Sequence, residues 1–451
     1  MKRPCTGYTA LPAVFFTIVL LVTASFAELF IPASDTNINY YGRFDFSVAD
    51  QARFNWSGSI IEASFTGTSI GIELVDGNTD YDIEIDGKLH SVLRTSSSTK
   101  YPISTSLTNT THVIRIMQRS ENHWNVNVFK GFYVADGNGL VTLPKSQSRK
   151  IEFIGDSWTA GYGNESPSRD CNDAQLRQYT NANKSFSKLT ADAFHAECMA
   201  LAWSGAGIVR NYGESTKKSV SPYPVYYDKT LGAVSGTWDF TKWKPDLVFI
   251  CLGTNDFSTQ PYPDDTMYIN GYNALLSRVH TNYGNVPVIL AGTSNGPMNN
   301  LVQSIVNAQK TTYNHPNTYY FQFPESQTLT GCHWHPSTAD HQLDSKEIVK
   351  SIMTNIGWDT AVSTPVVNVY NKKDCYKPDF TIIQGTTVKI SLPGNTQHAT
   401  VSVSDLSGKV VYKAAVNGNQ SCYWNFASVS SGVYMIRNEQ SRQMVSFVVK
   451  K

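Results

Sequence analysis

Four nearly continuous apolar runs constrain the fold of this 451-residue chain more than any other feature. They occupy 151–155, 198–203, 246–252 and 286–291, and segments with helical patterns are found at 176–194, 268–283, 299–313 and 338–356. Strands that are apolar along their whole length are typical of parallel sheets with helices on both faces. We therefore predict an α/β/α domain over 147–360, in which ligands bind beyond the carboxyl ends of the strands.

Segments rich in β-formers flank this domain. Within 28–146, short alternating runs at 69–75, 81–86, 112–117 and 124–129 predict half-buried antiparallel strands and a β-sandwich of the jelly-roll type. This sandwich is either a binding domain or a structural companion of the central domain. After a linker at 361–372, runs at 387–392, 400–404, 409–412, 433–436 and 445–449 predict a small all-β sandwich over 373–451.

The first 27 residues have the pattern of a secretory signal peptide. Lys2 and Arg3 precede an apolar stretch at 11–22, and small residues stand at Ser25 and Ala27. An N-terminal membrane anchor is the alternative, but this stretch is short for a span, and no later segment approaches about twenty apolar residues. We expect cleavage after Ala27, a secreted protein, either extracellular or at the cell surface, and a mature form without a membrane span.

Cleavage would leave six cysteines, an even number that is compatible with disulfides in an oxidising compartment. By domain and proximity, we expect the pairs Cys375–Cys422 and Cys171–Cys198. Cys251 lies inside an apolar run and is expected to be a buried free thiol. The cysteine spacing matches no zinc site, so no metal is expected.

Composition excludes several classes of function. The 37 Lys and Arg residues balance 36 Asp and Glu residues without a basic run, which argues against nucleic acid as a partner. A hydrophobic content of 41% argues against disorder. Only 16% of residues are charged, against roughly 25% in typical soluble chains, and Ser, Thr, Asn, Tyr and Trp take their place. Such a surface suits neutral, hydroxyl-rich partners.

Residues with useful chemistry follow the apolar runs. Ser157 comes directly after the first run, near the amino end of a helix, where backbone N–H groups favour developing negative charge. Gly205 follows the second run and lets its N–H approach a ligand closely, and Asn255 follows the third run and offers an amide donor. His335 precedes the last predicted helix, and histidine, with a reference pKa near 6.5, is the usual base for serine activation.

Each of these residues alone could belong to a turn or to the surface, but together and in this order they resemble the SGNH branch of the GDSL hydrolases, whose central domain has a flavodoxin-like fold. The resemblance implies that Ser157 is the nucleophile and His335 the general base. It also implies that Gly205 and Asn255 donate to the oxyanion together with the Ser157 amide.

The blocks at 155–165, 202–213, 252–256 and 332–337, preceded by a β-sandwich, are similar to those of carbohydrate esterase family two. This resemblance implies the removal of O-acetyl groups from acetylated plant polysaccharides such as xylan and glucomannan, or from their fragments, without a cofactor. A lipolytic or general short-chain esterase of the same fold is an alternative function, and a glycan-binding protein without activity is another.

One departure from the family concerns the group that orients the base. Many members of the superfamily carry Asp three residues before the histidine, and some family members carry it two residues before; Cys332 and His333 stand at these positions here. Either a backbone carbonyl accepts the Nδ1–H of His335, which leaves a Ser-His dyad, or an acid arrives from elsewhere in the chain. We favour the dyad. The His333 side chain is a further candidate, although a neutral imidazole supplies no negative charge.

Aromatic residues accompany the same blocks. Because their rings can stack on sugar faces, we expect Trp158 and Tyr212 to line the mouth above Ser157 and to contact substrate. Trp203 ends an apolar run and is expected in the core.

Near the C-terminus, the segments 401–411 and 431–437 and the basic end at Lys450-Lys451 resemble the sorting domains of type IX bacterial secretion. This resemblance implies recognition by the secretion machinery. A carbohydrate-binding module is the alternative for this domain.

Overall fold

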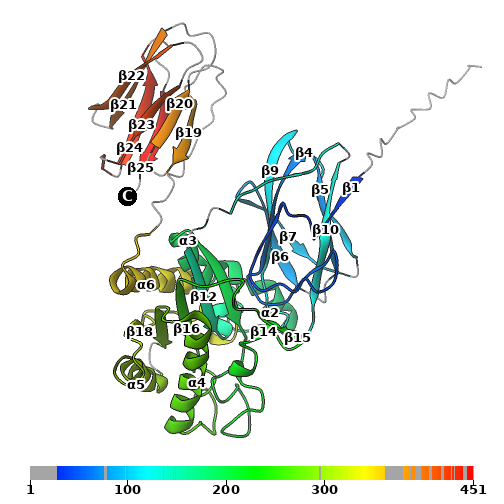
Figure 1. The fold of residues 1–451 in the computed structure, drawn as a ribbon, viewed down its shortest axis with the longest axis vertical. Helices are drawn as coiled ribbons and strands as arrows, with labels where there is room; N and C mark the ends of the chain where they lie inside the picture. The colour runs from blue at the N-terminus through cyan, green and yellow to red at the C-terminus, as the bar shows by residue number, and fades with distance from the viewer. Residues whose placement is uncertain are drawn as a thin grey trace, which may run out of the picture.

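The computed structural model describes residues 28–360, apart from 76–78, 97, 136, 146, 148 and 294–295. It also describes 379–449, apart from 385–386, 392–397, 406–408, 418–420, 428, 431 and 440–443. The expected signal peptide, the expected linker, Cys375 and the end at Lys450-Lys451 lie outside these residues. An N-terminal β domain, a central domain with helices around a sheet and a C-terminal β domain follow one another along the chain (Figure 1). No helix in the described ranges is long and apolar enough to cross a membrane.

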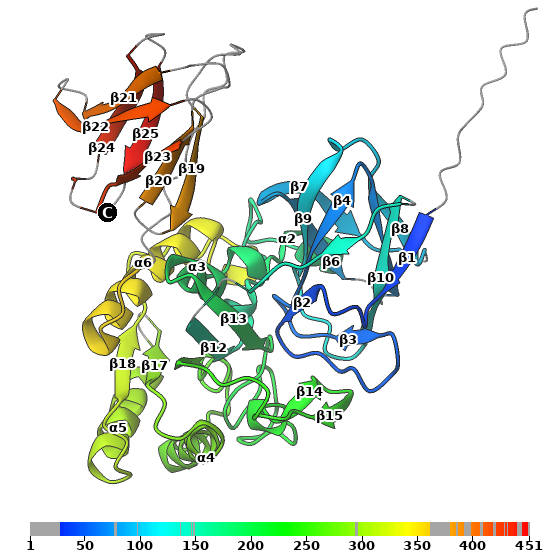
Figure 2. The same ribbon diagram turned by 45° about the horizontal axis from the view of Figure 1, so that its top comes forward.

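The N-terminal domain is a sandwich of antiparallel sheets, as the alternating pattern predicts (Figure 2). One sheet has the order β1-β10-β5-β8, with β3 paired to β10, and the facing sheet has the order β11-β4-β9-β6-β7, with β2 paired to β4. Alternate side chains, including Phe65, Tyr81 and Phe129, are fully buried in its core. The strands are β1 (Glu28–Pro32), β2 (Ile38–Tyr41), β3 (Ala52–Phe54), β4 (Ile60–Gly67), β5 (Ile70–Val75), β6 (Asp80–Ile85), β7 (Lys88–Arg94), β8 (Lys100–Ser104), β9 (Thr110–Gln118), β10 (Asn127–Ala135) and β11 (Leu140–Val141).

The central domain is built on a parallel sheet with the strand order β13-β12-β16-β17-β18. Its strands are β12 (Arg149–Gly155), β13 (Ala196–Ala202), β16 (Leu247–Cys251), β17 (Val288–Gly292) and β18 (Thr318–Gln322). The first four correspond to the apolar runs, which confirms the predicted α/β fold. Strand β18 was not predicted, because its sequence TYYFQ is polar at both ends and only partly buried.

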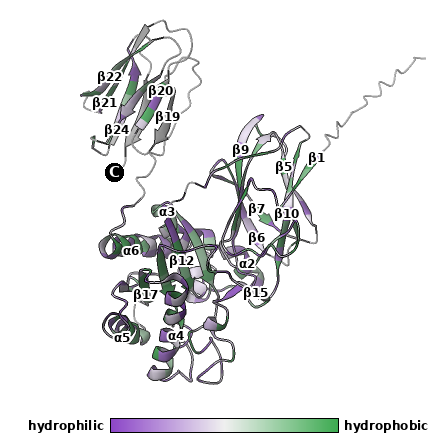
Figure 3. Ribbon diagram, viewed as in Figure 1, coloured by the Kyte–Doolittle hydropathy of each residue, from purple (hydrophilic) through white to green (hydrophobic). Residues whose placement is uncertain are grey.

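Helices cover both faces of this sheet. α3 (Phe186–Ala193) and α6 (Thr338–Ile356) pack together on one face, over Ile151 and Phe153. α4 (Asp265–Tyr283) and α5 (Met298–Thr311) cover the other face, over Ile154 and Ile250. Helix α4 carries both hydrophobic and hydrophilic residues in Figure 3, as expected of a helix with one side on a sheet. Short elements complete the domain: α1 (Ser157–Ala160), α2 (Asp173–Tyr179), η1 (Ala182–Lys184), η2 (Tyr223–Val225), η3 (Cys332–Trp334), and the hairpin β14 (Lys229–Leu231) with β15 (Ser235–Thr237).

The strand order determines where a ligand can bind. From β12 the chain passes to β13 on one side and then returns to β16 on the other side, so the connections diverge beyond the carboxyl end of β12. In open α/β sheets this switch point is the usual ligand site. Ser157 follows β12 at this position.

Buried polar contacts join the N-terminal and central domains. The fully buried Arg43 donates to the carbonyls of Tyr227 and Lys229 and forms an ion pair with Glu152 at 3.4 Å. Arg119 of the N-terminal domain also pairs with Glu165 of the central domain. Buried pairs of this kind need a defined geometry, so they hold the two domains in one relative position.

The C-terminal domain is a small antiparallel sandwich, as predicted. It pairs β19 (Asp379–Gln384), β20 (Thr387–Ser391) and β23 (Ser421–Asn425) in one sheet, and β22 (Val410–Asn417), β21 (His398–Asp405), β24 (Gly432–Asn438) and β25 (Met444–Val449) in the other. Val403, Trp424 and Ile436 lie in its core.

Candidate active site

Ser157 lies on a sharp turn between β12 and α1. Asp156 is the N-cap of α1, and its buried carboxylate accepts a hydrogen bond from the Trp158 amide at 3.1 Å. A Cβ at Gly155 would come within 2.0 Å of the Thr159 hydroxyl oxygen, so this close approach requires glycine. As the first residue of α1, Ser157 has a backbone N–H without an acceptor inside the helix.

His335 contacts the serine directly. Its Nε2 lies 2.8 Å from Ser157 Oγ, and its Nδ1 lies 2.9 Å from the Cys332 carbonyl and 3.2 Å from the His333 carbonyl. Carbonyl oxygens only accept, so Nδ1 must carry the proton, and Nε2 is left to accept the serine hydroxyl. Burial lowers the pKa of His335, although its hydrogen bonds to the two carbonyls oppose this effect. The neutral imidazole is therefore in the state that a base needs.

The turn before His335 directs these carbonyls. His333 and Trp334 both have positive φ, at 53° and 65°, a left-handed conformation that is uncommon in residues other than glycine. The Cys332 amide donates to the Gly163 carbonyl at 3.1 Å, and a Cβ at Gly163 would lie only 2.3 Å from Cys332 Cβ. These close contacts fix the turn against the loop that follows the nucleophile.

A disulfide between Cys171 and Cys332 also holds this turn. The expected pair Cys171–Cys198 is therefore wrong: Cys198 lies on β13, whereas Cys171 lies in a loop beside the turn of the base. Cys251 is buried and free, as predicted. Cys422 is also free, and its expected partner, Cys375, lies outside the described residues.

Gly205 lies in the loop after β13, the strand that pairs with β12 directly before Ser157. Its φ is 79°, and a Cβ built on it would meet no atom within 4 Å, so the space beside it is open. Within the described part of the chain, no backbone carbonyl accepts its N–H. The buried Asp256 carboxylate holds this loop, because it accepts the amides of Ile208 and Val209 at 2.9 and 2.8 Å.

Asn255 reaches the same place from the end of β16. Its amide nitrogen donates to the Ala206 carbonyl at 2.9 Å and to Asp156 Oδ2 at 3.2 Å. Burial, together with the nearby charges of Asp256 and Glu121, raises the pKa of Asp156 to about 7, against the opposing Trp158 hydrogen bond. Both amide hydrogens of Asn255 thus have protein acceptors. To donate to an oxyanion, Asn255 must exchange its longer hydrogen bond, the one to Asp156, for a bond to the oxyanion.

The structure brings Ser157, Asn255 and His335 together with the loop that carries Gly205. The two aromatic residues expected to contact substrate differ in exposure. Trp158 is only 7% exposed and packs against Phe323 in the core, which corrects the expectation that it lines the mouth. Tyr212, by contrast, is 62% exposed, and its amide donates to the Gly205 carbonyl at 2.8 Å. Trp203 is buried, as predicted.

The imidazole of His333 does not contact the ring of His335 through a hydrogen bond. Its Nε2 lies 3.0 Å from the Cys171 carbonyl, and its Nδ1 lies 3.0 Å from the Tyr162 hydroxyl. Nε2 therefore donates to the carbonyl, and Nδ1 accepts from the phenol. His333 contributes its backbone carbonyl to the base, and its side chain links the surrounding loops.

Sequence reasoning missed two residues near the base. The ring of Tyr162 lies 4.3 Å from the ring of His335, and its position between Gly161 and Gly163 in the nucleophile block was the available signal. Glu121 of the N-terminal domain accepts the Ser204 amide, beside Gly205. No pattern in the sequence connects this carboxylate with the central domain.

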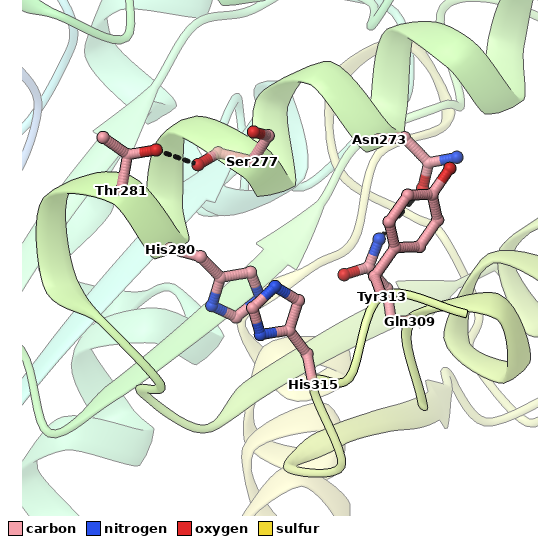
Figure 4. A pocket seen from close by; sticks show the side chains of 7 residues that line it. All are labelled: Asn273, Ser277, His280, Thr281, Gln309, Tyr313 and His315. Carbon is pink, nitrogen blue, oxygen red and sulfur yellow. Dashed lines mark hydrogen bonds between the residues drawn. The ribbon is translucent and has the colours of Figure 1, made fainter. Parts of the chain in front are cut away.

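A separate pocket of about 340 Å³ lies between α4 and α5 (Figure 4). His280 and His315 stack there with their ring centroids 3.5 Å apart. None of the site residues lines this pocket. Among the described residues, no group of three or more His, Cys, Asp or Glu side chains could hold a metal ion.

Comparisons with known proteins agree with the fold. Residues 40–144 match the family model "Carbohydrate esterase 2 N-terminal", 153–343 match "GDSL-like Lipase/Acylhydrolase family", and 384–451 match "Secretion system C-terminal sorting domain". The chain is 34% identical over 317 residues to an acetylxylan esterase / glucomannan deacetylase of Cellvibrio japonicus (strain Ueda107), covering 67% of this chain and 86% of that protein. The chain belongs to carbohydrate esterase family two.

Two further proteins are similar to the same part of the chain. The cellulase/esterase CelE of Acetivibrio thermocellus is 34% identical over 336 residues, which make up 71% of this chain but only 40% of that longer protein. A family two carbohydrate esterase from Clostridium thermocellum, solved in complex with cellohexaose, is 31% identical with a TM-score of 0.67, covering 71% of this chain and all of that one. The match at 384–451 confirms the resemblance to a sorting domain and marks the protein as secreted or bound to the cell surface.

Proposed function

We propose that this protein is a secreted esterase that removes O-acetyl groups from plant cell-wall polysaccharides, such as acetylated xylan or glucomannan, or from their fragments. The contact of 2.8 Å between His335 Nε2 and Ser157 Oγ, with Nδ1 on backbone carbonyls, carries the proposal. Membership of the family and the activity of the Cellvibrio relative support the choice of substrate.

In the first step, His335 Nε2 takes the proton of Ser157 as Oγ attacks the acetyl carbonyl carbon. The carbonyl oxygen becomes an oxyanion, which the amides of Ser157 and Gly205 and the side chain of Asn255 stabilise. When the tetrahedral intermediate collapses, the bond to the sugar oxygen breaks, and that oxygen takes the proton from His335. The products are a free sugar hydroxyl and acetyl-Ser157.

In the second step, His335 takes a proton from water as the water oxygen attacks the acetyl-serine. Collapse of the second intermediate releases acetic acid and returns the proton to Ser157 Oγ. Because Nδ1 stays bonded to carbonyls, the imidazolium is held in place without a neighbouring aspartate in its own turn.

Exposed aromatic rings near the site support a sugar as substrate. Trp334 is 64% exposed, and the Arg169 guanidinium lies 3.6 Å from its ring centroid. Trp124 is 72% exposed, and its ring contacts the ring of Trp203 edge-on. Trp203 directly precedes the Ser204–Gly205 turn. With Tyr212, these amphipathic rings could stack on sugar residues on either side of the acetyl group. The cellohexaose in the structure of the Clostridium relative is consistent with a glycan in this role.

The sorting-domain match supports a second partner. We infer that the secretion machinery of the producing cell recognises the C-terminal domain. Export would bring the esterase to polysaccharides outside the cell.

Acetate release from acetylated xylan and acetylated glucomannan tests the proposed function. The wild type should release acetate from at least one of them and act poorly on long-chain aryl esters, whereas Ser157→Ala should lose at least about 10³-fold in rate. Ser304→Ala is the matched control, because this exposed serine lies on α5 and bonds only the Leu301 carbonyl. A preference for long-chain esters would indicate a lipolytic enzyme. Glycan binding without acetate release from any acetylated glycan would indicate a binding protein.

A further inference from the structure

One segment of the N-terminal sandwich contacts the loop that carries Gly205 in the active site. Glu121 lies between β9 and β10, and both of its carboxylate oxygens face the backbone N–H of Ser204, at 3.1 and 3.3 Å. Ser204 directly precedes Gly205, whose amide is the proposed oxyanion donor. A carboxylate from one domain therefore holds the oxyanion loop of the other.

The neighbours of Glu121 fix this arrangement. His123 is 5% exposed and stacks on Trp203 at 3.8 Å, with the two rings only 8° from parallel. Its Nε2 lies 3.7 Å from the Glu121 carboxylate. Arg119, on the other side, is tied to Asp82 and to Glu165. Glu121 thus stands between two anchored residues, and its side chain is only 21% exposed.

The charge of Glu121 acts on the base. Burial is the main influence on the pKa of His335 and lowers it, and the Glu121 carboxylate opposes this effect, while His333 adds to it. Of the two charged groups that act on the pKa of His335, Glu121 is the negative one. Burial raises the pKa of the Tyr162 phenol, with a further contribution from Glu121, and burial lowers the pKa of His341 to about 3, so both side chains are neutral.

We propose that Glu121 is a positioning residue of the esterase site, which holds the Ser204–Gly205 turn and supplies from the sandwich domain the negative charge that the base lacks in its own turn. This inference rests on the function proposed above. A carboxylate that does not touch the imidazole can still stabilise the imidazolium through space, since the intervening protein screens charges less than water does. The sandwich domain is then a part of the catalytic unit.

Histidine titration by NMR tests the charge without any substrate, so its result is independent of the enzymatic assay. The ring signal of His335 is assigned by its loss in His335→Gln, and its midpoint is measured in the wild type, Glu121→Gln and Glu84→Gln. Glutamine keeps an oxygen for the Ser204 amide but removes the charge. Glu84 is the matched control, because it lies in the same domain, is 23% exposed and pairs with Arg115. Glu121→Gln should lower the midpoint by about 0.5 pH unit, and Glu84→Gln should leave it unchanged.

Rates test the positioning role. Because alanine removes the acceptor of the Ser204 amide as well as the charge, Glu121→Ala should have a kcat about tenfold below that of Glu121→Gln, with KM within twofold. An unshifted His335 midpoint in Glu121→Gln, or equal kcat values for the Gln and Ala variants, would overturn the inference. A wild type that releases no acetate would instead count against the proposed function and leave the NMR comparison standing.

Discussion

Removal of the Cys171–Cys332 disulfide should weaken both stability and catalysis. The bond joins residues 161 positions apart, and the Cys332 carbonyl accepts the Nδ1–H of His335. In the chain-entropy model, a loop of this length gives about 5 kcal/mol of stabilisation at 25 °C. Other contacts, such as Arg169 Nε to the Leu329 carbonyl at 2.8 Å, also tie the two loops. We therefore expect a measured loss of about 2–4 kcal/mol for Cys171→Ser.

The catalytic effect follows from the position of the carbonyl. A shift of the Cys332 turn misaligns His335, and a misplacement near 1 Å can cost up to about 100-fold in rate. We expect kcat of Cys171→Ser to fall by roughly 10- to 100-fold. Treatment of the wild type with a reductant should lower its kcat by a similar factor. Cys198→Ser is the control, because this cysteine is free and its replacement removes no disulfide. Both the free energy of unfolding and kcat should then stay close to their wild-type values. The measurements are urea unfolding and acetate release, with and without dithiothreitol. A reduced wild type with an unchanged kcat would refute this reasoning.

Three further predictions concern the base and the oxyanion. His333→Ala should keep kcat within about threefold, because Nδ1 of His335 is bonded to backbone carbonyls; a loss near 10⁴-fold in acetate release would instead make the His333 ring the orienting group. The value of kcat/KM should fall with decreasing pH as His335 gains a proton, and it should be constant at higher pH. Because burial lowers the pKa of His335, the midpoint of this fall should lie below pH 6.5, and a midpoint above pH 6.5 would contradict the burial argument. Asn255→Ala should lower kcat by about 10²–10³-fold, whereas an effect confined to KM would exclude the donor role.

The sequence allowed the core of the central domain to be predicted for a simple physical reason. Strands buried on both faces must be apolar throughout, and parallel strands place their carboxyl ends at one edge, so Ser157, Gly205 and Asn255 had to meet there. Strand β18 lies at the edge of the sheet, where partial burial permits polar residues, and its pattern was not distinctive.

The rest of the site depends on contacts that no local pattern carries. Trp158 follows the nucleophile, but α1 turns its ring into the core against Phe323. The pairing of Cys171 with Cys332 and the contact of Glu121 with Ser204 join segments that are far apart in the chain. The orientation of His335 by carbonyls needs positive φ at His333 and Trp334, which neither residue type indicates.

Detection of the acyl-enzyme tests the central claim most directly. The wild type is mixed with acetylated glucomannan or xylan, quenched in acid during turnover and digested, and the peptide that contains Ser157 is examined by mass spectrometry. The Ser-His mechanism predicts an acetyl group on Ser157 in the wild type and its absence in Ser157→Ala. Steady acetate release with this peptide unmodified, or acetate release by Ser157→Ala at the wild-type rate, would contradict the account.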